Sequence, residues 1–292
     1  MPSLRDIRNR IGSVRSTRQI TRAMKMVSAA KLRRAQDAIL RTRPSAQLLE
    51  EMLSRVAARI EPDEAGVHPL LAARPTPKVA EFVAITSDRG LAGGFNANIA
   101  RRAQRFAVEN AERFDQILLS TIGRKGRDAA RLRRIDVRKD YTGVLSDLRY
   151  EKAEAIARDL SERFLSGQVD AVFLCYTEFK NAISQKPVLA QLLPIEPAKE
   201  ASPVAGGIDF KYEPSRAAVL EALLPRHVSM QVWRALLESA ASEHGARMTA
   251  MESATKNADE MIGSLTLQYN RARQAYVTKE LLEIVSGAEA LK

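Results

Sequence analysis

The last 67 residues of the chain, which follow Pro225, contain no proline, and from Met251 onward their core-type positions alternate in steps of four and three. A 3.5-residue repeat that lasts several turns keeps one seam of a helix facing a partner helix and imposes a left-handed supercoil. The sequence therefore predicts a long coiled-coil helix, about 90 Å from Arg226 to Val285 if it is continuous. Its expected seam positions are Met251, Thr255, Ala258, Ile262, Leu265, Tyr269, Ala272 and Tyr276.

The N-terminal segment supplies a candidate partner helix with the same spacing of apolar residues. Two helices at opposite ends of one chain must run antiparallel if they pair within that chain, so we expect an antiparallel coiled coil beside a compact middle domain. A three-residue irregularity near Thr17 is expected to make the seam slip. The positions expected on this seam are Leu4, Ile7, Ile11 and Val14 before the slip, and Ile20, Met24 and Val27 after it.

Between these helices the sequence predicts a small α/β domain, because short apolar runs alternate with helical patterns. Pro44 is expected to kink the first helix or to open a second segment that ends near Ile60. The predicted organisation is a basic helix at 1–60, a linker at 61–77, a Rossmann-like domain with a mostly parallel sheet at 78–208, and a final helix at 209–292. Strands are expected at 79–86, 116–122, 171–179 and 188–195, and helices at 96–111, 124–134 and 150–165.

Most of the chain's excess positive charge lies in its first 60 residues, which contain 14 Lys or Arg and 4 Asp or Glu. A basic helix is expected to meet an acidic surface. Nucleic acid is one such surface, and Arg8, Arg15 and Arg22 form a heptad-spaced basic line. No aromatic residues interleave this line and no known reading motif accompanies it. A basic nucleic-acid-binding coiled coil stays an alternative, beside a merely solvated charged face.

The glycine-rich segment Ser87–Asn96, S-D-R-G-L-A-G-G-F-N, lies between a predicted strand and a predicted helix. Such a turn can hold phosphate on backbone N–H groups at a helix N-terminus. Its glycines match neither the dinucleotide-binding pattern nor the lysine-bearing P-loop. A tight structural turn is therefore the favoured interpretation, for this segment and for Gly123–Gly126, and a nucleotide-binding α/β protein stays a second alternative.

No catalytic or metal-binding pattern accompanies these elements. His68, His227 and His244 are far apart in sequence and have no metal-ligand spacing with Cys175, the single cysteine. Serines and carboxylates fall in no nucleophile or acid–base pattern. The charged N-terminus has no apolar targeting core, and no stretch is apolar enough to span a bilayer. The residues alone predict an interaction protein with no cofactor and no metal.

Three motifs together resemble the gamma subunits of F-type ATP synthases, over essentially the whole chain and in order. They are Ile7–Val27 followed by Ala30–Gln36, the segment Ser87–Asn96 with Ala92 where the family usually has cysteine, and Tyr269–Gly287. The chloroplast members of the family carry an inserted cysteine pair that this chain lacks, so thiol switching is not expected. The general sequence style is similar to that of bacterial members.

The resemblance implies a central rotor and not an enzyme. In this family the terminal helices form an antiparallel coiled coil inside a ring of three alpha and three beta subunits, and the α/β domain lies at the membrane-proximal end, on the c-ring. Proton flow turns the c-ring and the shaft, and the shaft drives the three catalytic beta sites through their states. The implied partners are the alpha, beta and epsilon subunits and the c-ring, without nucleic acid. The implied location is the cytoplasmic face of the bacterial inner membrane, with the mitochondrial matrix side as the alternative.

The resemblance also assigns roles to individual positions. Met24 matches a position near the acidic lever of the beta subunit, and Arg247 matches an arginine linked to coupling. The positions expected to touch the surrounding ring are Arg273, Gln274 and Thr278, with Leu281, Leu282, Ile284 and Val285 as an apolar tip. The positions expected at the foot, near epsilon or the c-ring, are Asp209, Tyr212 and Glu213. Residues from the coiled-coil seam or from solvated helix faces would show the same spacing.

Overall fold

The computed structural model describes residues 3–57, 68–182, 184–196, 213 and 215–289. It divides into two compact units, Met1–Ala29 with Arg247–Lys292, and Ala30–Ala246. Two long helices, α1 (Leu4–Ala57) and α5 (Arg216–Glu289), contribute to both units. The domain boundaries predicted at 60, 77 and 208 stay predictions, because two of them fall in 58–67 and 197–212, outside the described residues.

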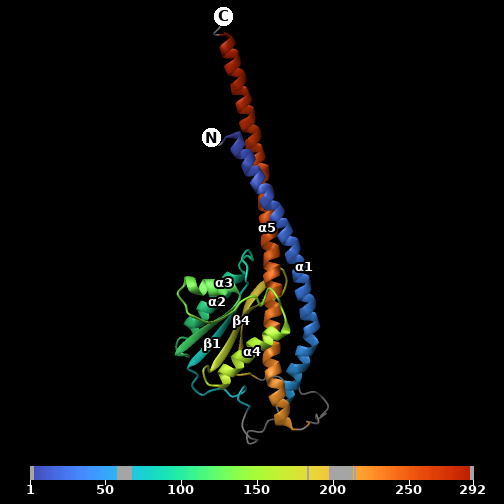
Figure 1. Ribbon diagram of the computed structural model, residues 1–292, viewed down its shortest axis with the longest axis vertical. Helices are drawn as coiled ribbons and strands as arrows, with labels where there is room; N and C mark the ends of the chain where they lie inside the picture. Colours follow the sequence, from blue (N-terminus) through green and yellow to red (C-terminus); the bar gives the residue numbers. More distant parts are fainter. Residues whose placement is uncertain (1–2, 58–67, 183, 197–212, 214, 290–292) are drawn as a thin grey trace. The chain divides into compact units, whose positions relative to one another are not determined.

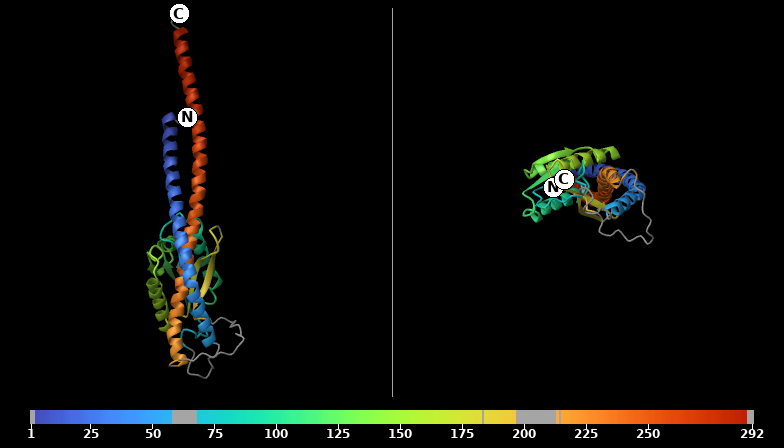
Figure 2. Two further views of the ribbon diagram at one scale, coloured as in Figure 1. Left: turned by 90° about the vertical axis from the view of Figure 1, so that its right-hand side faces the viewer. Right: turned by 90° about the horizontal axis from the view of Figure 1, so that it is seen from below.

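The first unit is an antiparallel pair of helical segments, as the sequence predicted. Figure 2 shows the N-terminal part of α1 and the C-terminal part of α5 side by side. Residue numbers rise along one helix as they fall along the other, which fixes the antiparallel direction. The contacts that show this are Arg8 with Tyr269, Arg18 with Asp259, Thr21 with Thr255, and Lys25 with Glu252.

The seam of α1 does not slip as expected. Buried and half-buried positions recur in steps of three and four without interruption between Leu4 and Leu53. Ile20 and Val27 are 59% and 57% exposed, so the prediction that they lie on the seam is wrong. The buried positions in these turns are polar, Thr21 and Ser28. The heptad spacing of buried positions therefore continues through these turns, although the residues at those positions are polar.

Helix α1 continues through Pro44 to Ala57, so Pro44 opens no second segment. A proline inside a helix removes one hydrogen bond and costs about 3 kcal/mol. The helix is held in the unit on either side of Pro44, at Thr42 and at Leu53. Leu53 is buried, and the indole N–H of Trp233 on α5 donates to the hydroxyl of Thr42 over 3.3 Å.

The second unit contains a five-stranded sheet in the order β3-β2-β1-β4-β5. Strands β1 to β4 run parallel, and β5 pairs with β4 in the antiparallel direction. The mostly parallel sheet is as predicted, although one strand, β3, was not expected. The strands are β1 (Val79–Ile85), β2 (Gln116–Ile122), β3 (Val137–Tyr141), β4 (Ala171–Phe179) and β5 (Gln185–Leu193). The connecting helices are α2 (Phe95–Glu109), α3 (Arg124–Leu132) and α4 (Tyr150–Leu165).

Helices cover both faces of this sheet, because successive side chains of a strand point to opposite faces. On β1, Phe82 and Ala84 join an aromatic core that includes Phe106 of α2. Val83 and Ile85 join the larger core formed with α4 and with the part of α5 in this unit. Figure 1 shows α2 and α3 together on one face and α4 on the other. The carboxyl ends of the parallel strands thus share one edge of the sheet.

Candidate functional site

The glycine-rich turn lies where ligands usually bind an open α/β sheet. The strand order reverses between β1 and β4, and ligand crevices form outside the carboxyl ends of the strands at such a point. Ser87–Asn96 follows β1 directly. Ser87 and Asn96 close the segment on itself, since the backbone N–H of Ser87 donates to Asn96 Oδ1 over 3.0 Å and Asn96 Nδ2 donates to Ser87 Oγ over 2.8 Å.

Asp88, the second residue of this motif, ties three segments of the unit together. Its buried carboxylate accepts hydrogen bonds from the backbone N–H of Arg124 over 3.2 Å and of Gly143 over 3.3 Å. The hydroxyl of Ser146 donates to it over 2.9 Å. Asp88 thus holds the start of α3 and the loop before α4 against the turn. Its carboxylate uses backbone N–H groups that a phosphate would need.

Helix α5 fills the crevice itself. Ala246 packs against Ala92 and Phe95 of the motif in a buried cluster. The backbone of Thr177, in β4, donates its N–H to Ser239 Oγ over 3.4 Å, and its carbonyl accepts from Ser242 Oγ over 3.0 Å. A nucleotide at the switch point would have to displace this helix. The geometry therefore supports the structural interpretation of the motif that the sequence favoured.

A close approach between α5 and β4 explains a glycine that weakens the helix in isolation. A Cβ atom added at Gly245 would lie 3.3 Å from the ring of Phe179. The backbone N–H of Phe179 also donates to Glu238 Oε2 over 2.8 Å. The roughly 1 kcal/mol that a glycine costs inside a helix is offset here by contact between helix and strand.

A buried ion cluster on the α4 face was not predicted from the sequence. The carboxylate of Glu81 is 0% exposed and lies 2.6 Å from Arg138 Nη2 and 3.0 Å from Arg163 Nε. Ser120 Oγ donates to it over 2.6 Å. Asp159 lies 3.0 Å from the same Arg138 nitrogen. The only sequence signal was one carboxylate inside the apolar strand V-A-E-F-V-A-I.

The electrostatics of this cluster favour its charged state. Burial alone raises the pKa of Asp159, but hydrogen bonds from Lys139, Tyr141 and Arg138 lower it overall, to about 2. Burial and the hydrogen bond to Asp159 raise the pKa of Tyr141. The cluster joins β1, β2, β3 and α4, and its charges are paired with one another, so we interpret it as a structural tie within the unit.

The polar section of the coiled coil is paired across the two helices. The hydroxyls of Thr21 and Thr255 lie 2.8 Å apart on the seam. Lys25 and Glu252 lie 2.5 Å apart on one side of them. Polar residues at seam positions specify register at some cost in stability. This section thus fixes how the two helices are aligned.

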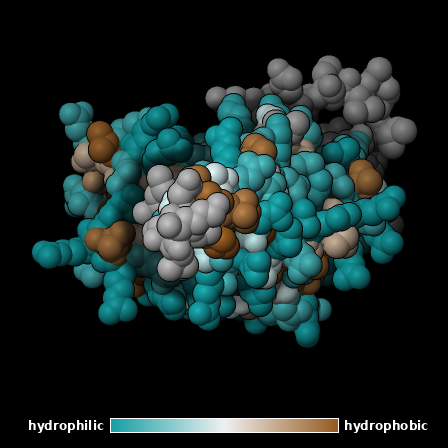
Figure 3. Space-filling view, turned by 90° about the horizontal axis from the view of Figure 1, so that it is seen from above, coloured by the Kyte–Doolittle hydropathy of each residue, from teal (hydrophilic) through white to brown (hydrophobic). Residues whose placement is uncertain are grey.

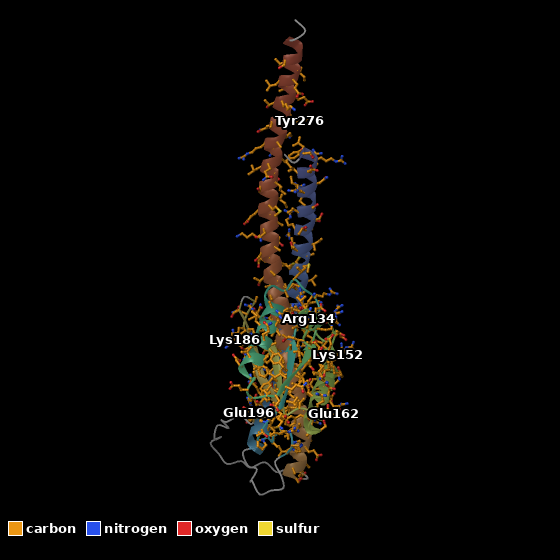
Figure 4. All side chains as sticks on the ribbon, turned by 90° about the vertical axis from the view of Figure 1, so that its left-hand side faces the viewer. Arg134, Lys152, Glu162, Lys186, Glu196 and Tyr276 are labelled. Carbon is orange, nitrogen blue, oxygen red and sulfur yellow. The ribbon has the colours of Figure 1, made fainter. Side chains whose placement is uncertain are left out.

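The C-terminal end of α5 runs past the start of its partner helix. Every described side chain from 273 to 286 is exposed. Tyr276 is 58% exposed, so its predicted place on the seam is wrong; it projects from α5 beyond the N-terminal end of α1 in Figure 4. The reason is length: in this register Leu4, the first helical residue of α1, lies opposite the turn of α5 that contains Ala272.

The structure brings the predicted tip residues together on two turns of α5. Leu281, Leu282, Ile284 and Val285 are 57–63% exposed, and the first, third and fourth of them share one helix face. Lys279 and Glu283 form an ion pair of 3.5 Å on these turns. Figure 3, which views the molecule from the end where α5 terminates, shows apolar side chains among polar ones. Arg273, Gln274 and Thr278 are exposed on the preceding turns.

The other predicted positions have different surroundings. Met24 is half-buried on the seam, next to the Lys25 ion pair. Arg247 is only 8% exposed, so it is not a solvated helix charge. Glu213 is exposed, whereas Asp209 and Tyr212 lie outside the described residues.

Within the described residues, no cluster of His, Cys, Asp and Glu could hold a metal ion. Among the same residues, no helix is long and apolar enough to cross a membrane. Cys175 is buried in the core, and burial raises the pKa of its thiol to about 12. Cys175 therefore packs as a small buried hydrophobe.

Comparisons with known proteins decide the family. The family described as "ATP synthase" matches residues 3–291. A curated ATP synthase gamma chain from Anaeromyxobacter sp. (strain Fw109-5) is 76% identical over 292 residues, which is all of both chains. The chain belongs to the ATP synthase gamma chain family. The resemblance that three motifs indicated is confirmed, and the comparisons support neither the nucleic-acid-binding nor the nucleotide-binding alternative.

Solved structures of this family share the fold. A chain from the central stalk and c-ring structure of the Tetrahymena thermophila mitochondrial ATP synthase is 28% identical, with a TM-score of 0.59 over 80% of this chain and 99% of that one. A chain from the Euglena gracilis mitochondrial ATP synthase, in rotational state 3, has a TM-score of 0.69 over 99% of this chain and 94% of that one, at 22% identity. Chains in solved ATP synthase structures therefore share this fold of long terminal helices and a central sheet.

Proposed function

We propose that this chain is the central rotary shaft of an F-type ATP synthase. The observation that carries the proposal is the exposed C-terminal end of α5, where four large apolar side chains are without cover in the described chain. Burial of a Leu or Ile side chain is worth about 1.5–3 kcal/mol, so such a turn is stabilised by a surrounding protein surface. The ring of alpha and beta subunits is the surface that the family relationship supplies.

The shaft performs no bond chemistry in this proposal. Its α/β unit uses its switch-point crevice to hold α5, and its polar clusters tie elements together. Rotation of the c-ring, driven by proton flow, turns the chain, and its changing face moves the three catalytic beta sites through their states. The reverse direction couples ATP hydrolysis to rotation.

Different parts of the chain are proposed to contact different subunits of the complex. Exposed Arg273, Gln274 and Thr278 face the ring, with the tip residues seated at its far end, and Met24 and Arg247 meet the ring only through the small part of each that is exposed. The foot, Asp209, Tyr212 and Glu213, meets the epsilon subunit or the c-ring. The exposed basic line Arg8, Arg15 and Arg22 faces the acidic lever of the beta subunit. The complex holds one copy of the chain, on the cytoplasmic face of the bacterial inner membrane.

The test is rotation of a single complex reconstituted from this full chain with alpha and beta subunits. A bead is attached to a cysteine introduced at exposed Glu112, since the native Cys175 is buried and unreactive. Unidirectional rotation that requires ATP is the expected result. A complex that assembles and hydrolyses ATP without rotating the bead would overturn the proposal.

The role of the tip is tested separately in the same assay. Leu281→Ser combined with Ile284→Ser should lower the torque, because two apolar contacts with the ring are lost. Lys279→Gln combined with Glu283→Gln is the matched control, since it removes an exposed ion pair from the same turns. Equal torque from both double variants would refute the tip contact and leave the shaft assignment standing.

A further inference from the structure

A cavity of about 400 Å³ lies between α2 and α3, on the face of the sheet opposite α4. Its floor is formed by side chains of β1 and β2, including Phe82, Ala84 and Leu119, and its walls by the two helices. The volume falls within the range of roughly 300–1,000 Å³ that small-molecule sites occupy. The ion cluster described above lies on the other face of the sheet, and Asn96 is the member of the glycine-rich segment that lines this space.

The hollow exists because the two helices present small side chains to it. Ala100, Ala103 and Ala107 line it from α2, and Gly126 and Ala129 line it from α3. As a result, the helices cover the side chains of the inner strand β2 beneath the cavity only in part.

Strand β2 lies between β3 and β1, where apolar side chains are normally buried, yet Ile117 and Leu119 are only half-buried. Both side chains line the cavity. The exposed part of these two side chains is consistent with a space that the chain's own atoms leave unfilled. Apolar surface of this kind is stabilised by an apolar occupant.

The two ends of the cavity differ in chemistry. Thr86, Asn96 and Thr121 line it at the carboxyl edge of the strands, together with Lys125 at the start of α3. At the opposite edge, Val108 is 80% exposed and Ile135 is 43% exposed. An occupant that matches this gradient has a polar head and an apolar tail.

The charge at the polar end is positive. The hydroxyl of Thr86 donates to Ile122 O over 3.1 Å, and that of Thr121 to Asp140 Oδ1 over 2.9 Å, so these groups already have partners. The ammonium of Lys125 is 3.6 Å from Asp128 in an exposed ion pair, which is worth little.

The residues that line the cavity include two cations, Lys125 and Arg133, and no carboxylate. The guanidinium of Arg133 donates to the carbonyl of Ala129 on its own helix, over 3.2 Å. Lys125 is therefore the cation that is placed to meet an anionic head.

The width of the cavity restricts the tail. Helices α2 and α3 contact each other, so the slot between them cannot admit a third helix of about 10–12 Å diameter. An extended alkyl chain is narrow enough. The path from Lys125 to Arg133 along α3 is about 12 Å, and a chain that advances roughly 1.2 Å per bond covers it with about ten carbons.

We propose that this cavity binds a linear-chain carboxylate of roughly ten carbons, with its carboxylate at Lys125 and its alkyl chain lying over Ile117 and Leu119 toward Val108. The assignment is independent of the rotary function. The site belongs to the second unit alone, and none of the proposed ring contacts contributes to it.

The experiment titrates the full chain with sodium decanoate below its micelle concentration, by isothermal calorimetry, with decanol as the neutral probe. Lys125→Gln should weaken decanoate binding roughly tenfold and leave decanol binding unchanged, because only the charged head meets the ammonium. Lys186→Gln is the matched control: it removes an exposed lysine from β5, which Figure 4 labels, and should change neither affinity.

Filling the cavity provides the second arm. Ala103→Leu places three further carbons in the space above the sheet, so it should abolish binding of both probes without lowering the melting temperature. Absence of decanoate binding to the wild-type chain would overturn the proposal. The proposal would also be overturned if the Lys125→Gln variant bound decanoate as tightly as the wild-type chain does. This variant changes an exposed side chain, so it stays informative even if the Ala103→Leu variant fails to fold.

Discussion

Substitution of Glu81 by glutamine should cost the second unit about 3 kcal/mol of unfolding free energy. The change keeps the shape of the side chain but removes the charge that two arginines share at 2.6 and 3.0 Å in a fully buried position. Removal of one partner of a buried pair costs about 3–5 kcal/mol. Arg138 keeps Asp159 at 3.0 Å, which places the expected loss at the lower end of that range.

The assay is urea unfolding followed by the fluorescence of Trp233, the single tryptophan of the chain, which lies in the same unit. In thermal unfolding the same loss should lower the melting temperature by about 6–12 °C for a unit of this size. Glu154→Gln is the matched control, because its 3.7 Å pair with Arg158 on the same helix is exposed and should matter by less than about 0.5 kcal/mol. A loss below about 1 kcal/mol for Glu81→Gln would show that the cluster does not stabilise the fold.

Two further substitutions test the backbone and the pH response. Gly123→Ala should destabilise the second unit by more than about 3 kcal/mol in urea unfolding, because Gly123 has φ +95° and an added Cβ would lie 2.0 Å from the carbonyl oxygen of Thr86. Gly143→Ala is its control: φ is +72° but nothing lies within 4 Å, so only the backbone cost of about 1–2 kcal/mol is expected, and equal losses would contradict the clash. Burial lowers the pKa of His227, and the charge of Glu50 opposes this shift only in part. Near and below pH 6.5, the ordinary pKa of histidine, the unfolded chain therefore binds a proton at His227 that the folded chain does not bind. The free energy of unfolding should consequently fall as the pH drops from 7.5 toward 5.5. His227→Gln should reduce that slope, by at most about 1.4 kcal/mol per pH unit, in unfolding measured across this range; an unchanged slope would assign the proton uptake elsewhere.

The central strands and helices could be predicted closely from local pattern. Strand β2, helix α4 and strand β4 occupy the expected ranges, because each is a buried or amphipathic run bounded by polar residues. The two edge strands, β3 and β5, could not be predicted as closely. Strand β3 reads V-R-K-D-Y and has no apolar run, since its charged side chains serve the ion cluster and the sheet edge. Strand β5 begins at Gln185, three residues before the expected start, for the same reason.

The coiled-coil seam shows a different limit of sequence reasoning. Apolar spacing located both helices and their antiparallel pairing, but it assigned Ile20 and Val27 to the seam instead of Thr21 and Ser28. A polar seam residue is recognisable only when its partner on the other helix is known, as Thr255 is for Thr21. Hydrophobic pattern alone therefore favours the nearest apolar residue.

The predicted site residues divide in the same way. The exposure of the tip follows from helix lengths and could be anticipated from the sequence, since α5 is the longer helix. The burial of Arg247 could not be anticipated, because the residues around a charged helical position do not show whether its side chain is buried. Asp88 accepts hydrogen bonds from Gly143 and Ser146, which are more than fifty residues further along the chain. The sequence could therefore predict the turn that contains Asp88, but not these hydrogen bonds.

The packing of α5 against the sheet also sets an order of events during synthesis. The strands and helices from Val79 to Leu193 leave the ribosome before α5, yet Leu224, Val228 and Leu236 belong to their core. A nascent chain that stops before Arg216 contains all five described strands but lacks the helix that forms one wall of their core. This unit therefore completes its fold only when translation has passed Ala246, and the apolar face of its sheet must be kept from other chains until then.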